Sequence, residues 1–113
     1  MELPLGLAVA SDSVVLDGVD PRLMAYMEHL GMVHQMLFGK PLTITSGKEG
    51  HHVQNSFHAI GRAVDGRTED KDPEEQLVFM TVISFSARSQ GIAVFDERST
   101  YDGKHIHFEL HGA

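Results

Sequence analysis

The sequence predicts a small α+β domain in which an antiparallel or mixed sheet carries two main helices on one side. Two well-signalled helices are interspersed with short apolar stretches that have strand character. The length of 113 residues suits one domain with one core, so we expect residues 1–113 to fold as a single unit. The apolar fraction of 42% is enough for a modest core and well above that of a disordered chain.

The first apolar stretch, residues 3–10, is expected to be an ordinary strand or arm. Ala8, Val9 and Ala10 resemble a signal-peptidase site, but Glu2 stands where a signal peptide has a basic region. The apolar stretch is also short for a signal peptide. We therefore expect no standard signal peptide and synthesis in the cytoplasm.

The first helix is predicted to follow Asp20, which is a suitable N-cap, with Pro21 at the first helical position. Gly39 is a plausible stop for it. Apolar residues recur between these limits at helical spacing, namely Leu23, Met27, Leu30 and Leu37. Its two histidines, His29 and His34, are interpreted as partly exposed or hydrogen-bonded helix residues rather than as ligands.

The second helix is predicted to start at Asp72 and Pro73, where Glu75 completes a capping-box pattern. We expect it to run to about Gln90, with Gly91 as its C-cap. Apolar residues surround most of its circumference, which predicts that it is the buried helix.

Four further strands are predicted from short runs rich in β-branched and aromatic residues, at residues 42–45, 62–65, 92–95 and 105–110. The last of these alternates between polar and apolar residues. Two long polar loops, residues 46–57 and 96–104, separate the strands. Long loops in a small domain are commonly functional.

Composition excludes several classes of function. The formal net charge of −7 argues against a nucleic-acid binder, which normally has a basic face. No apolar run approaches the roughly 20 residues that span a bilayer. Cysteine is absent, which excludes disulfides, thiolate metal sites and cysteine nucleophiles.

Histidines and carboxylates gather in two places and predict a metal site. His105 and His107 lie two apart on a predicted strand, so both point to one face, with Glu109 next along it. His58 precedes Asp65 by seven residues, across a turn that Gly61 permits. Two imidazole nitrogens and one carboxylate oxygen are a typical catalytic zinc set that leaves a fourth position open. We therefore expect one Zn²⁺ ion bound by His58, Asp65 and His107.

The segment Ser56-Phe-His58-Ala-Ile-Gly61-Arg-Ala-Val-Asp65, followed by His105-Ile-His107, resembles the M15 zinc peptidases. This family includes D-alanyl-D-alanine carboxypeptidases and the L-alanyl-D-glutamate endopeptidases of phage endolysins. It shares a fold with the lysostaphin-type enzymes and the hedgehog signalling domain. The resemblance is specific over residues 44–67 and 103–109. It implies a hedgehog/DD-peptidase-like fold and hydrolysis of peptide bonds in the stem peptides of bacterial peptidoglycan, with phage-encoded proteins among the relatives.

Carried over residue by residue, the resemblance makes His58, Asp65 and His107 the zinc ligands. His105 matches a histidine that faces the reacting carbonyl, and Ser56 matches a serine that contacts substrate. Zinc in such sites polarises the scissile carbonyl and lowers the pKa of a water molecule, while a base takes the water's proton.

Two departures from the family pattern leave the base open. Lys104 stands where many M15 enzymes have a catalytic carboxylate, and Glu49 stands where many have an arginine. His105 is the preferred base, with Asp102 and Glu109 as the other candidates. His52 is a candidate electrophile in place of the arginine.

Three other interpretations stay open at this point. The chain is a zinc-binding module of the same fold with little or no hydrolysis, a cupin-like barrel, or a globular domain without metal. The two helices argue against a cupin. Which peptide bond is cut and the oligomeric state are not indicated by the sequence.

Overall fold

The computed structural model describes residues 3–49, 56–99 and 104–112. The elements in chain order are β1 (Leu7–Val9), α1 (Pro21–Phe38), β2 (Leu42–Ser46), β3 (Ala63–Arg67), α2 (Pro73–Ser86), a 3-10 turn η1 (Arg88–Gln90), β4 (Ile92–Asp96) and β5 (His105–Leu110). No helix within these ranges is both long and apolar enough to cross a bilayer.

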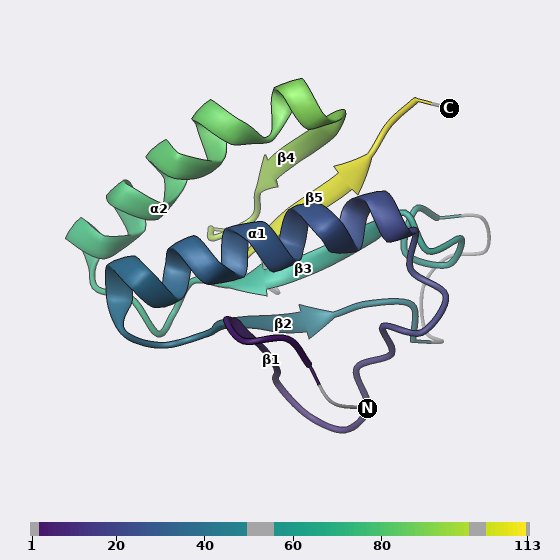
Figure 1. Ribbon diagram of the computed structural model, residues 1–113, viewed down its shortest axis with the longest axis horizontal. Helices are drawn as coiled ribbons and strands as arrows, with labels where there is room; N and C mark the ends of the chain where they lie inside the picture. The colour runs from purple at the N-terminus through teal and green to yellow at the C-terminus, as the bar shows by residue number, and fades with distance from the viewer. Residues whose placement is uncertain (1–2, 50–55, 100–103, 113) are drawn as a thin grey trace.

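The strands form one mixed sheet in the order β1-β2-β3-β5-β4. β1 runs parallel to β2, and the remaining neighbours pair antiparallel. Figure 1 shows α1 and α2 on the same side of this sheet. The predicted α+β class, with a mixed sheet and both helices on one side, is therefore confirmed.

Both predicted helix starts are confirmed by their caps. The Asp20 carboxylate accepts a hydrogen bond from the Arg22 amide at 2.9 Å, and Pro21 begins α1. The Asp72 carboxylate accepts from the Glu75 amide at 2.8 Å, and the Glu75 carboxylate accepts from the Asp72 amide at 3.0 Å. These reciprocal bonds satisfy amide donors that the first turn of a helix leaves without partners.

The second helix differs from its prediction in length and burial. α2 ends at Ser86, and the chain to Gly91 continues as η1. Only Phe79 and Ile83 of α2 are buried, whereas Leu77 and Phe85 are 67% and 86% exposed. The prediction that α2 is the buried helix is wrong. α1 packs more residues into the core, because it crosses the middle of the sheet (Figure 1).

The sheet has one covered face and one open face. Along β5, Ile106, Phe108 and Leu110 are buried in the core that also contains residues of both helices. His105, His107 and Glu109 alternate with them and therefore point to the opposite, helix-free face. The covered face stabilises the fold, and the open face presents polar side chains from neighbouring strands.

The two histidines of α1 do not join this polar face. His34 is buried on the core side, where its Nδ1–H donates to the carbonyl of Lys40 at 2.8 Å and its ring packs edge-on against Phe79. His29 is exposed on the same helix. Neither belongs to a group that could hold a metal among the described residues, in agreement with their predicted role as helix residues.

Candidate metal centre

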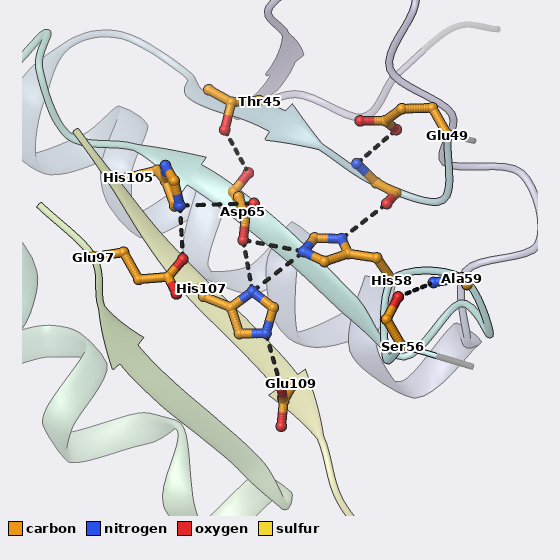
Figure 2. Close-up of polar contacts among 11 residues, drawn as sticks. Thr45, Glu49, Ser56, His58, Ala59, Asp65, Glu97, His105, His107 and Glu109 are labelled. Atoms are coloured by element: carbon orange, nitrogen blue, oxygen red, sulfur yellow. Dashed lines mark hydrogen bonds and ion pairs between the residues drawn. The ribbon is translucent and has the colours of Figure 1, made fainter. Parts of the chain in front are cut away.

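Strand register places the acidic ligand candidate directly opposite a histidine. β3 and β5 pair so that Asp65 faces His107 and Val64 faces Phe108. Because side chains alternate between the two faces of a sheet, Asp65 and His107 both point to the open face. Figure 2 shows the two side chains meeting there.

The third candidate ligand, His58, comes from a turn just before β3. The Ser56 hydroxyl accepts a hydrogen bond from the Ala59 amide at 3.1 Å, and the Gly61 amide donates to the carbonyl of His58 at 3.0 Å. These bonds fix the turn that carries His58 toward Asp65 (Figure 2). Ser56 thus has a structural hydrogen bond, and its contact with substrate stays a prediction.

Gly61 gives a first testable prediction. Its φ is +76°, and a Cβ at this position would lie 2.3 Å from the Gly18 carbonyl oxygen. Gly39 has a similar φ of +72° but open space around it. We expect Gly39→Ala to lower the free energy of unfolding by about 1–2 kcal/mol through left-handed strain alone. Gly61→Ala should cost clearly more in urea unfolding, and equal losses would contradict the proposed steric contact.

Three potential ligand atoms converge at this point of the open face. His107 Nδ1 lies 2.8 Å from Asp65 Oδ1, His58 Nε2 lies 3.4 Å from that oxygen, and the two nitrogens are 3.2 Å apart. Ligands bound tetrahedrally to zinc at 2.0–2.1 Å are separated by about 3.3–3.5 Å. The observed spacing is close to that of a ligand set, and the three side chains are largely buried.

The hydrogen bonds on the far side of each ring show why a cation fits. His58 Nδ1–H donates to the carbonyl of Gly47 at 2.9 Å, and His107 Nε2–H donates to Glu109 at 2.9 Å. A neutral imidazole has one N–H, so each ring then presents a lone pair to Asp65. Three acceptor atoms converge, and only a cation between them stabilises that arrangement. The outer partners are of the kind that orient metal-binding histidines.

The close approach of Asp65, His58 and His107 also shifts the pKa values of these three side chains. Burial raises the pKa of Asp65, but hydrogen bonds with His107 and His58 outweigh it and lower this pKa to about 2. Burial lowers the pKa of both histidines, but the Asp65 carboxylate outweighs it and leaves each pKa above its ordinary value. A proton on either imidazole and a metal ion therefore compete for the same place.

This competition predicts how metal affinity depends on pH. Asp65 stays ionised throughout the range because its pKa is about 2, so only His58 and His107 bind competing protons. Zn²⁺ affinity should be constant at alkaline pH and fall as the pH drops through the raised histidine pKa values. The fall should approach about tenfold per pH unit for each histidine that must lose a proton. Titration calorimetry in several buffers measures it, and a pH-independent affinity would exclude these ligands.

Beside these three side chains lies a second group, made of Asp65, Glu97 and His105. The sequence indicated Asp65 and His105 as functional residues, but not Glu97. His105 Nε2–H donates to Glu97 Oε1 at 2.7 Å, and the same nitrogen lies 3.8 Å from Asp65 Oδ2. Glu97 was missed as a functional residue. β4 and β5 pair with Phe95 opposite His107, so residue 97 comes level with His105 just beyond the strand. That register is the signal that could have identified Glu97.

The two residues that depart from the M15 pattern contact groups other than the candidate ligands. The Glu49 carboxylate accepts from the amides of Gly47 at 2.8 Å and Val15 at 3.0 Å, so it braces the loop whose carbonyl orients His58. Lys104 has a φ of 82° and its ammonium group lies 3.7 Å from Glu69. Of the other candidates, Glu109 contacts His107, whereas His52 and Asp102 fall outside the described residues.

The comparisons with known proteins leave the site to be interpreted from its own geometry. Neither a scan against models of protein families nor a search of curated proteins returned a match to this chain. The structure does have groups of histidine and carboxylate side chains that can hold a metal ion. Both groups lie on the open face of the sheet and include Asp65.

Proposed function

We propose that this chain is a zinc-dependent peptidase that hydrolyses peptide bonds in peptidoglycan stem peptides. The observation that carries the proposal is the convergence of His58 Nε2, Asp65 Oδ1 and His107 Nδ1 beside the His105–Glu97 pair. Two imidazoles and one carboxylate suit Zn²⁺ and leave a position for substrate. When bound, zinc supplies a Lewis acid for the scissile carbonyl.

The His105–Glu97 pair supplies proton transfer in this proposal. Peptide hydrolysis needs a group that takes a proton from the attacking water and returns it to the leaving nitrogen. His105 Nε2 and Glu97 Oε1 are 2.7 Å apart and share one proton, so together they can accept a second one. Glu97 thereby provides a carboxylate in place of the one that many M15 enzymes have at the position of Lys104. It lies 8 residues before His105, its hydrogen-bond partner.

The substrate class rests on the resemblance of residues 56–65 and 105–107 to the M15 peptidases. The surroundings of the ligands are compatible with a small apolar peptide group. Phe95 is 47% exposed and its ring centroid lies 5.7 Å from that of His107. It therefore offers an apolar surface next to the proposed reacting position, of a kind that methyl groups of alanyl residues can contact.

The test is hydrolysis of a defined substrate. Purified peptidoglycan and isolated muropeptides are incubated with zinc-loaded protein, and new amino termini are quantified. We expect products with the zinc-loaded protein and a return to background after chelation, with recovery on adding Zn²⁺. Absence of products across several stem-peptide types would overturn the peptidase assignment.

A zinc-binding module without hydrolysis is the second candidate. It is favoured by Glu49, which braces a loop instead of supplying a cationic group, and by Lys104, whose ammonium group is next to Glu69. Such a module would bind stem peptides or a partner and leave them intact. It predicts zinc binding with the pH dependence given above and no new amino termini.

A further inference from the structure

The carboxylate of Asp65 has two oxygens, and each faces a different set of side chains. Oδ1 lies among His58 and His107, whereas Oδ2 lies 3.8 Å from His105 Nε2. Glu97 Oε1 completes the second set at 2.7 Å from that nitrogen. The ligand atoms of Asp65, Glu97 and His105 all lie within 4.8 Å of one another.

This second set has the chemistry of a metal site in its own right. The His105 imidazole on β5 meets the Asp65 carboxylate on β3 and the Glu97 carboxylate just beyond β4. The His105 and Asp65 side chains are 17% and 11% exposed. Two carboxylates flanking one nitrogen favour a cation there, because their negative charges otherwise repel each other in a partly buried place. Mixed nitrogen and oxygen donors suit Zn²⁺ and similar divalent ions.

We propose that a second divalent cation binds between Asp65, Glu97 and His105, with Asp65 bridging it to the ion held by His58 and His107. In two-metal hydrolytic sites the ions are about 3.5–4 Å apart, a separation that a single bridging carboxylate spans. The open face of the sheet would then hold two ions per chain, one more than the sequence predicts. The second ion is the weaker one, because Glu97 is partly exposed and has to exchange its hydrogen bond with His105 for the metal.

The consequence for activity rests on the proposed function. His105 Nε2 and Glu97 Oε1 cannot bind a metal ion and transfer the proton of hydrolysis at the same time. Peptide cleavage is therefore expected to rise as the first ion binds and to fall as the second binds. Excess Zn²⁺ would therefore inhibit the proposed peptidase by binding within its active site.

Metal stoichiometry tests the inference independently of hydrolysis. Chelator-treated protein is titrated with Zn²⁺ by calorimetry, and native mass spectrometry counts the ions per chain. We expect two ions in the wild type, with distinct affinities. Glu97→Gln and His105→Ala should each weaken the second binding step at least about tenfold and leave the first step in place.

Glu69→Gln is the matched control, because Glu69 is a neighbouring glutamate that pairs with Arg67 and Lys104 instead of the ligands. It should retain both binding steps. A single ion in the wild type would overturn the inference while leaving the peptidase proposal intact. Two ions that persist unchanged in Glu97→Gln and His105→Ala would place the second ion elsewhere and would also overturn it. Two ions without hydrolysis would instead remove the peptidase proposal alone.

Discussion

Replacing Asp65 by asparagine is expected to abolish the stabilisation of this fold by Zn²⁺. Asp65 is the carboxylate shared by both groups of side chains that could hold a metal ion, and it is 8% exposed. At a free zinc concentration about 1,000 times the dissociation constant, binding stabilises a folded protein by about 4 kcal/mol. The wild type should gain stability of this order in zinc, measured by urea unfolding, and Asp65→Asn should gain almost none.

The comparison uses the zinc-induced change of each variant, so a difference between the metal-free proteins does not affect it. Asp17→Asn serves as control, because Asp17 is an exposed carboxylate in the loop before α1 and belongs to neither group. It should respond to zinc as the wild type does. A full zinc response in Asp65→Asn would remove Asp65 from the ligand set.

The parts of the fold that the sequence predicted well depend on local signals. Asp20 with Pro21 and Asp72 with Pro73 identify both helix starts, because N-capping involves residues only a few positions apart. The alternation in β5 identifies the buried and open faces of that strand. The burial of α2 failed as a prediction because its apolar residues lie on several faces, and only packing decides that Phe79 is covered and Phe85 is not.

The candidate metal ligands could be predicted for a similar reason, whereas Glu97 could not. His58 and Asp65 are linked by a short turn, and His105 and His107 share one strand face. Glu97 joins them only through the register of β4 against β5, which is set by long-range pairing of the two strands. The bracing role of Glu49 likewise depends on Val15, which lies 34 residues away in the sequence.

Under the proposed peptidase function, Glu97→Gln is expected to lower the turnover of stem-peptide hydrolysis by about 10²–10⁴-fold, the usual range for loss of a general acid–base group. Glutamine keeps the size of the side chain and can still accept from His105 Nε2–H, but it cannot take up a proton. His105→Ala should cause a loss of similar size. If the two residues act as one pair, the double variant should lose little more than either single variant, because their effects are then not additive.

If the pair had only a structural role, its loss would also disturb the neighbouring candidate ligands and weaken zinc binding. If the pair transfers protons, the tight zinc-binding step and the midpoint of urea unfolding should match the wild type in both single variants. Glu69→Gln, which changes a glutamate outside the pair, should keep full turnover. Wild-type turnover in Glu97→Gln would show that another group handles the proton. Losses that multiply in the double variant would show that Glu97 and His105 act separately, since removing one member of a functional pair already removes what the other contributes.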